Sequence, residues 1–196
     1  MLDGATKFIC HHIPGAAPRD IDDLVRWRNV LRGMALIGVD TDGIGYGNIS
    51  TRRGDGFVIS GTQTGHIHLA TEEEFTFVAD VDLETNELCC MGPVAASSES
   101  MTHAAIYRAA PWVNAVAHAH DNTLWEQLID IVPTTRRGIP YGTPAMAMEF
   151  ERLLRETSFP IERVAVMGGH DGGLVFVGED LEEAGRKGTD MKESIN

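Results

Sequence analysis

The stretch AVAHAH, residues 115–120, alternates strictly between alanine and a larger side chain. In a β-strand, residues two apart point to the same face, so His118 and His120 would project together. In a helix, the same spacing would put them on roughly opposite sides. The intervening alanines would face the other way, and small side chains are expected where a helix packs closely behind a strand. The pattern therefore predicts a buried strand within a layered arrangement of sheet and helices.

Helical and strand patterns are mixed along the rest of the chain. Apolar spacing together with start and stop signals predicts helices at 20–34, 97–110, 143–157 and 180–188. Asp20 is the expected N-cap of the first helix, and Gly188 is expected to close the last one. Short apolar runs separated by turn residues predict strands within 35–60, 75–92 and 164–178. We expect one α/β domain over residues 1–196 with a largely antiparallel sheet, an N-terminal arm (1–19) and a C-terminal tail (188–196).

The composition limits the possible partners. The 196-residue chain has a formal net charge of −13 and no block of Lys and Arg, which argues against nucleic acid and anionic membranes as partners. A small anionic substrate stays compatible with this charge, because a metal ion and backbone amides create a local positive site. No apolar run reaches the about 18 residues that span a bilayer. The sequence shows no signal peptide, and its three cysteines form no secreted-type framework, so we expect a cytoplasmic protein.

Two interpretations of His118 and His120 are open at this point. They are either hydrogen-bonded polar residues at a strand end or ligands of a metal, because adjacent buried imidazoles are costly unless they are paired or coordinated. His170, in the glycine-rich stretch MGGHDGG, is a third candidate ligand. Three imidazoles with an open fourth position are a common catalytic zinc arrangement. Glu99, in the first turn of the helix before this strand, either supplies an acid or base or simply favours the helix N-terminus.

Four sequence blocks, GNISTR, SSESMTHAAIY, AVAHAH and GGHDGGLVFVG, occur in the order and spacing that resemble the class II aldolase/adducin family. This family includes fuculose-phosphate and rhamnulose-phosphate aldolases and ribulose-phosphate 4-epimerase. The resemblance covers residues 21–187. It implies a three-layer α/β/α sandwich around a mainly antiparallel sheet, and a homotetramer with active sites between subunits. It also implies that His118, His120 and His170 bind Zn²⁺, or another divalent ion such as Mn²⁺ or Co²⁺, and that Glu99 is catalytic.

The same resemblance implies a pocket for a phosphate group. Its members would be Gly47, Asn48, Ser60, Gly61, Thr62, Ser97 and Ser98. Amides in glycine turns, hydroxyl groups and a helix N-terminus attract an oxyanion without a lysine. Taken alone, the glycines are explained equally well by turn geometry and the serines by helix capping. The loop SGTQTG departs from the usual Thr-Pro-Thr-Gly form, and no aromatic residue in TDMKESIN matches the one that some family aldolases supply from a C-terminal extension.

The resemblance implies a divalent-metal-dependent lyase that acts on a small ketose or ketose phosphate. The reaction would be retro-aldol cleavage of a carbon–carbon bond through a metal-stabilised enediolate, with Glu99 as the base. One alternative is a sugar-phosphate dehydratase or epimerase that uses the same site. The other is a non-catalytic, adducin-like interaction module, a type that lacks the metal residues that this chain contains.

A few more polar residues have two interpretations. His103, one turn beyond the candidate base on the same helix face, either orients that carboxylate or packs in the core. His66 and His68 form a second pair at this spacing, and we interpret them as solvated or supporting residues of a polar loop. Tyr141, in the stretch IPYGTP, is expected to approach the site from a loop.

Overall fold

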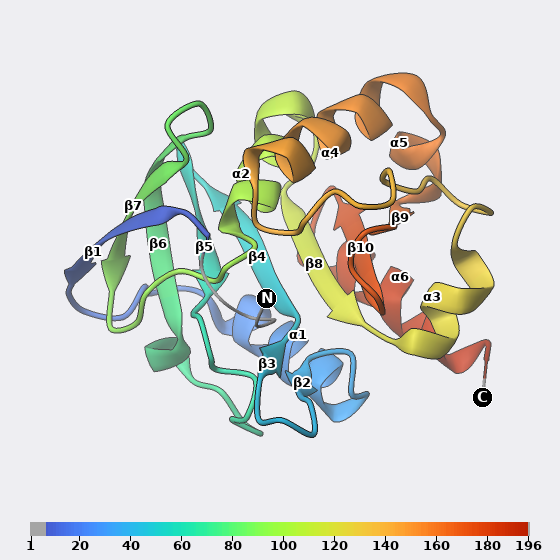
Figure 1. The fold of residues 1–196 in the computed structure, drawn as a ribbon. Coiled ribbons are helices and arrows are strands. Elements are labelled where there is room, and N and C mark those ends of the chain that lie inside the picture. Colours follow the sequence, from blue (N-terminus) through green and yellow to red (C-terminus); the bar gives the residue numbers. More distant parts are fainter. Residues whose placement is uncertain (1–6, 196) are drawn as a thin grey trace.

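The computed structural model describes residues 7–195, and an eight-stranded sheet forms its centre (Figure 1). The strands lie in the order β1-β7-β6-β5-β4-β8-β10-β9. Among the described strands, β1 and β7 run parallel, and every other neighbouring pair in this sheet is antiparallel. Strands β2 and β3 form a separate hairpin. Helices cover both faces of the sheet, so the predicted layered α/β fold is confirmed.

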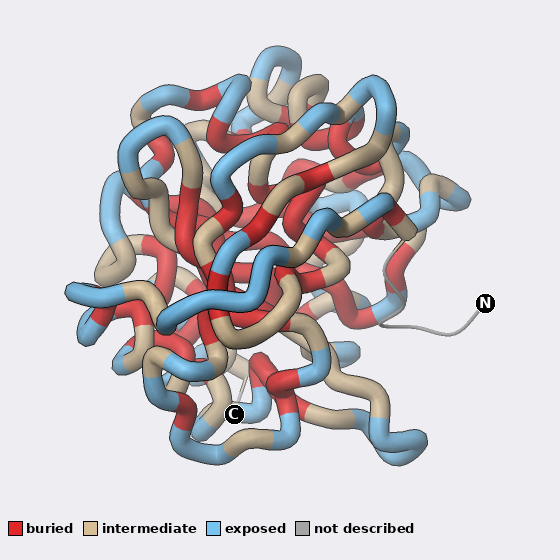
Figure 2. Tube along the Cα trace, turned by 90° about the vertical axis from the view of Figure 1, so that its left-hand side faces the viewer, coloured by how far each residue is buried: buried red, intermediate tan, exposed pale blue. Residues whose placement is uncertain are grey.

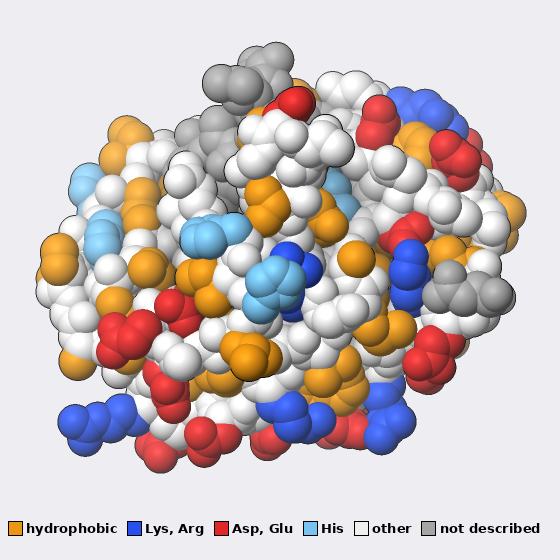
Figure 3. Space-filling model, turned by 90° about the horizontal axis from the view of Figure 1, so that it is seen from below, with side chains coloured by type: hydrophobic (Ala, Val, Ile, Leu, Met, Phe, Trp, Pro, Cys, Tyr) orange, Lys and Arg blue, Asp and Glu red, His pale blue; other side chains and the backbone are white. Residues whose placement is uncertain are grey.

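Helices and strands are mixed along the whole described chain. In chain order they are β1 (Ile9–Pro14), α1 (Asp22–Gly33), β2 (Gly38–Val39), β3 (Gly45–Tyr46), β4 (Asn48–Arg53), β5 (Gly56–Ser60), the 3₁₀ turn η1 (Glu72–Glu74), β6 (Phe75–Asp82), β7 (Glu87–Gly92), α2 (Ser100–Ala109), β8 (Ala115–His120), α3 (Asn122–Leu128), α4 (Pro144–Glu156), α5 (Phe159–Glu162), β9 (Val164–Val166), β10 (Gly173–Gly178) and α6 (Leu181–Glu193). Within residues 7–195, no helix has both the length and the apolar character to cross a membrane. On the face seen in Figure 3, Lys and Arg side chains are interspersed with acidic ones.

Strand β8 separates the two apolar cores of the domain. Val116 packs in the core that contains α2 and α4, whereas Ala117 and Ala119 pack in the core on the other face, which contains α1. All three side chains are fully buried, and buried segments run through the middle of the molecule (Figure 2). Helix α6 contacts β8 as well. The alternation in the sequence therefore has the predicted cause, because the alanines allow helices to approach the strand closely.

Helix α1 begins at Asp22, and the predicted capping role of Asp20 is wrong. Asp20 adopts a left-handed backbone conformation with a φ of 57°, and Ile21 takes the N-cap position without a side-chain cap. The carbonyl of Asp20 instead accepts a hydrogen bond of 2.8 Å from Arg53 Nη2. The turn before the helix is thus held by the end of β4. Val30 on this helix is an exposed apolar residue.

Two segments that were predicted to be irregular contain regular structure. The N-terminal arm includes β1, which pairs in parallel with β7 and extends the sheet. The helix that was predicted to close at Gly188 is α6, which continues to Glu193. A Cβ added to Gly185 would lie 2.2 Å from the Trp27 ring, and one added to Gly188 would lie 3.2 Å from Phe176. The glycines of α6 therefore permit close packing of the helix and do not end it.

A buried carboxylate fixes the connection between α3 and α4. Glu149 on α4 accepts hydrogen bonds from the backbone N–H and the guanidinium of Arg136, and from the guanidinium of Arg152. Burial pushes the pKa of Glu149 up, but these bonds outweigh burial and hold the pKa below its ordinary value. The connection that leads to Tyr141 is thereby tied to α4.

Replacing Glu149 by Gln should lower the free energy of unfolding by roughly 3 kcal/mol, because it leaves two arginine charges without their buried partner. A carboxyl whose pKa is lowered on folding stabilises the protein above its unfolded pKa of about 4.5, and the contribution is lost as the pH falls through the lowered pKa. Denaturation curves at neutral pH and at successively lower pH check both points, and the difference between the two proteins should shrink as the pH falls through the lowered pKa.

The matched control is Glu151→Gln on the same helix, which removes a more exposed pair with Arg108. It should cost less than about 1 kcal/mol. Equal losses for the two variants at neutral pH would show that Glu149 has no special part in stability.

Candidate metal centre

The end of β8 and the turn before β10 bring three imidazoles together. His118 and His120 share one face of β8, and the antiparallel pairing with β10 places Gly173 opposite His120. The chain turns sharply before β10, where His170 N–H donates to Met167 O and Gly173 N–H donates to His170 O. Ligand nitrogens of the three histidines all lie within 4.8 Å of one another. The fold therefore assembles the cluster that the sequence indicated.

Hydrogen bonds determine which ring nitrogens are available to a ligand. His118 Nδ1 lies 3.1 Å from Leu174 O. A carbonyl oxygen only accepts hydrogen bonds, so this nitrogen carries the hydrogen and Nε2 keeps its lone pair. His120 Nε2 lies 3.0 Å from His118 Nε2, so the two nitrogens face the same point. A histidine that donates one ring N–H to a carbonyl is oriented to bind a metal through the other nitrogen.

Burial keeps all three imidazoles neutral. It lowers the pKa of His120 and of His170 to about 3, and that of His118 well below the ordinary value, and the proximity of the other histidines adds to the effect. Neutral imidazole is the form that binds a metal ion. Converging lone pairs in a buried place are costly without a partner. The donor set therefore fits a divalent first-row ion such as Zn²⁺.

Glu99 occupies the N-cap position of α2 and is buried at the edge of the same cavity. Its backbone N–H lies 3.4 Å from Ser97 Oγ, and its carboxylate oxygen Oε2 accepts a hydrogen bond of 2.8 Å from Thr102 Oγ1. The carboxylate is not one of the ligand atoms that converge within 4.8 Å. The helix dipole favours a negative charge at this position. The geometry therefore sets the carboxylate of Glu99 apart from the three imidazoles.

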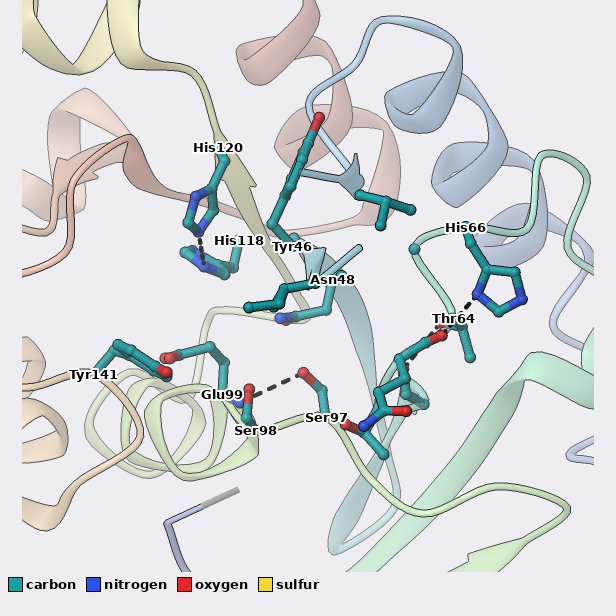
Figure 4. A pocket seen from close by; sticks show the side chains of 18 of the residues that line it. Tyr46, Asn48, Thr64, His66, Ser97, Ser98, Glu99, His118, His120 and Tyr141 are labelled. Atoms are coloured by element: carbon teal, nitrogen blue, oxygen red, sulfur yellow. Dashed lines mark hydrogen bonds between the residues drawn. The ribbon is translucent and has the colours of Figure 1, made fainter. Parts of the chain in front are cut away.

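The three histidines and Glu99 line one cavity of about 440 Å³ (Figure 4). Of the residues predicted to bind a phosphate, Gly47, Asn48, Gly61, Thr62, Ser97 and Ser98 line this cavity. Ser60 lies outside the lining, because it is buried in the sheet, where its Oγ accepts a hydrogen bond from the Ile49 N–H. The backbone amides of Gly61 and Thr62 donate to carbonyl groups of other segments. Those two amides are therefore committed to the fold.

One part of the cavity wall was not predicted from the sequence. The β2–β3 hairpin contributes Val39, Ile44 and Tyr46, and the Tyr46 ring centroid lies 5.4 Å from that of His120. The predicted SGTQTG loop contributes Gln63, Thr64 and Gly65 as well, and His66 follows it in the lining. Gln63 has a left-handed φ of 58°. The Gly-rich stretch DGIGYG indicates a turn, but no local pattern indicates that this hairpin lies beside the histidines.

Residues 31–195 of the chain match the family model described as Class II Aldolase and Adducin N-terminal domain. An L-fuculose-1-phosphate aldolase from Thermus thermophilus is 24% identical, with a TM-score of 0.64 and 88% of each chain covered. YgbL from Klebsiella pneumoniae, described as a putative aldolase/epimerase/decarboxylase, is 17% identical, with a TM-score of 0.65 and coverage of 88% of this chain and 84% of that chain. The N-terminal class II aldolase domain of a conserved Thermoplasma acidophilum protein is 16% identical, with a TM-score of 0.59 and coverage of 92% and 95%. The comparison with curated proteins gave no match.

The native chain, purified without chelators, should contain about one divalent ion per chain, and His120→Ala should lose most of it, because two imidazoles hold such an ion poorly. Elemental analysis by mass spectrometry measures the content. His66→Ala is the control, since this histidine lines the same cavity but lies outside the cluster. An ion content that is equal in all three proteins, or zero in all three after reconstitution with metal, would contradict the assignment of the centre.

Proposed function

Because the chain belongs to the family of class II aldolases and adducin N-terminal domains, we propose that it is a divalent-metal-dependent lyase that cleaves a carbon–carbon bond of a small ketose or ketose phosphate. The observation that carries the proposal is the convergence of three neutral imidazoles and a buried carboxylate on one cavity. This combination supports proton transfer beside a Lewis acid. The carbohydrate class of the substrate is suggested by the similar structures, which include a fuculose-phosphate aldolase.

In this proposal His118, His120 and His170 hold the ion, with Zn²⁺ as the first candidate and Mn²⁺ or Co²⁺ as alternatives. When bound, the ion would supply Lewis acidity that stabilises negative charge on the substrate's oxygen atoms. The chain's own contribution is to keep the imidazoles neutral through burial, and to orient His118 through the carbonyl of Leu174. These two effects prepare the ligands before any ion arrives.

Glu99 is the group that we assign to proton transfer. In retro-aldol cleavage a hydroxyl proton leaves, the adjacent carbon–carbon bond breaks to give an aldehyde, and a proton is added to the carbon that loses the bond. The carboxylate of Glu99 would accept the first proton and return one to carbon, so no co-reactant is needed. The 2.8 Å hydrogen bond from Thr102 to Oε2 holds the carboxylate in place for both transfers.

A phosphate group of the substrate would be bound by neutral donors. No Lys or Arg is among the residues that line the cavity. The backbone amides of Gln63, Thr64 and Gly65 donate to no acceptor within residues 7–195. The hydroxyl of Ser98 and the N-terminus of α2 lie at the same cavity. Free amides and a helix N-terminus attract an oxyanion, so we place the phosphate between this loop and α2.

Two alternative functions are compatible with the same observations. A dehydratase or an epimerase would use the same ligands and the same base, and YgbL carries a description that includes epimerase. A non-catalytic, adducin-like module belongs to another functional class, and the cluster together with Glu99 favours the enzyme. We also propose, from the family resemblance alone, a cytoplasmic homotetramer with active sites between subunits.

The experiment that tests this function incubates the metal-loaded protein with a panel of ketose phosphates that includes L-fuculose 1-phosphate, and with the corresponding free ketoses. Cleavage yields two smaller carbonyl compounds, whereas dehydration or epimerisation yields one organic product. Two fragments from any member of the panel would support the lyase. A single product would favour the dehydratase or the epimerase. A protein that binds no metal even after reconstitution, and that converts no member of the panel, would favour the interaction module.

Glu99→Gln should retain the ion but lower turnover by about 100-fold or more, because the amide is similar in shape and cannot accept the proton. Metal content and initial rates, measured on the same preparation, separate the two effects. The control is Glu126→Gln, an exposed position on α3 outside the cavity. Undiminished turnover in Glu99→Gln with the ion in place would remove Glu99 from the role of base.

A further inference from the structure

The start of the described chain is anchored beside the cavity. Lys7 precedes β1, and its carbonyl accepts a 2.7 Å hydrogen bond from the side-chain amide of Asn86. The carbonyl of Asn86 in turn accepts a 3.0 Å hydrogen bond from the Ile9 N–H. Asn86 lies between β6 and β7 in a left-handed conformation with a φ of 59°. The backbone of Lys7 is therefore fixed by the sheet, next to the parallel pairing of β1 with β7.

The side chain of Lys7 contacts Tyr141, which lies 134 residues away in sequence. Its ammonium donates a 2.9 Å hydrogen bond to Tyr141 O and lies 3.3 Å from the centroid of the Tyr141 ring. An ammonium at this distance from an aromatic face is attracted by the ring, and the attraction is stronger where water is partly excluded. Lys7 is only partly exposed. One side chain thus holds both the backbone and the ring of Tyr141.

Tyr141 contacts the histidine cluster, and its neighbour Gly142 lies close to the segment before α2. Its ring centroid lies 4.4 Å from that of His170, with the two planes inclined by 31°. The next residue, Gly142, has a left-handed φ of 64°, and a Cβ there would lie 2.9 Å from Ser98 O. Tyr141 lines the cavity together with Glu99, and Figure 4 shows these two side chains pointing toward one another. The phenol therefore lies where a substrate on the metal would meet it.

We propose that Tyr141 is a substrate-contacting residue of this site and that Lys7 is the positioning residue that holds it there. The phenol would donate a hydrogen bond to a substrate oxygen, and the ammonium beside the ring would strengthen that bond by withdrawing electron density. Lys7, at the start of the described chain, would then belong to the active site. This inference rests on the proposed lyase function, and it goes beyond it by assigning roles to Lys7 and Tyr141.

A purely structural role for Lys7 would predict a different outcome. A lysine that only fastens the N-terminal segment to the loop would affect thermal stability and leave the kinetics of the folded protein unchanged. A positioning role predicts a fall in kcat at constant metal content, and recovery when another cation replaces the lysine. The variants Lys7→Met, Lys7→Arg and Tyr141→Phe separate these roles. Lys187→Met, on α6 outside the cavity lining, is the matched control.

Each protein, loaded with metal, would be assayed for ion content, melting temperature, kcat and KM on the substrate that the ketose-phosphate panel identifies. The cobalt-loaded forms would also be titrated with dihydroxyacetone phosphate, and binding followed by visible absorption. We expect one ion per chain throughout. Tyr141→Phe should lower kcat by about 100-fold, at the lower end of the loss seen when one hydrogen-bond donor to a developing oxyanion is removed. Lys7→Met should lower kcat by about 10-fold, and Lys7→Arg should restore at least half of the native rate.

Unchanged kcat and KM in Tyr141→Phe would overturn the inference. So would a Lys7→Met protein that melts earlier but turns over normally. Tyr141→Phe removes one oxygen atom and Lys7→Arg keeps the charge, so both remain informative if Lys7→Met folds poorly. A native protein that holds its ion but neither binds dihydroxyacetone phosphate nor cleaves any member of the panel would instead overturn the proposed function, and this inference with it.

Discussion

Strand β8 is paired on one side with β4 and on the other with β10, and the register of these two pairings positions the candidate site. Asn48 lies opposite His118, and Gly173 lies opposite His120. A slip of one residue would turn the histidines toward the helices behind the sheet and the alanines toward the cavity. The alanines resist such a slip, because their face is covered closely by helices and has no space for imidazoles. Packing on one face of the strand therefore secures the ligands on the other.

The helix that carries Glu99 is fixed to this sheet by a buried polar network. Ser50 Oγ on β4 lies 2.7 Å from both His103 Nδ1 and Tyr107 Oη on α2. Burial lowers the pKa of His103 to about 3 and raises that of Tyr107, so both groups are uncharged near neutral pH. Of the two roles considered for His103, the contacts favour packing in the core, where it helps to fix the helix, since the carboxylate of Glu99 is held by Thr102. Glu99 and the histidine cluster thus share one rigid support.

Helices and strands with a clear periodicity or capping signal in their own sequence were predicted. Features that depend on contacts between residues far apart in the sequence were not. The strand of His118 and the helices α2 and α4 follow from periodicity and capping signals within about a dozen residues. The strand in the N-terminal arm was missed because β7, its neighbour in the described sheet, lies far along the chain. The end of α6 was misplaced at Gly188, because the sequence alone does not distinguish a glycine that ends a helix from a glycine that permits close packing. No sequence pattern connects Lys7 with Tyr141, because these two residues are distant along the chain.

The candidate site also shows why a net charge of −13 says little about the substrate. Exposed charges are screened by salt over about 8 to 10 Å, so most acidic side chains of the surface contribute little inside the cavity. Within the cavity the effective dielectric is lower, and groups a few ångströms away dominate the potential. These groups are free amides, the N-terminus of α2 and three neutral imidazoles, with Lys7 behind the ring of Tyr141. Because the lining contributes one carboxylate and no Lys or Arg, under the proposed function most of the positive charge for an anionic sugar would have to come from the bound ion. The affinity for a phosphorylated substrate would then be coupled directly to metal occupancy, which is the physical basis for proposing the two as one site.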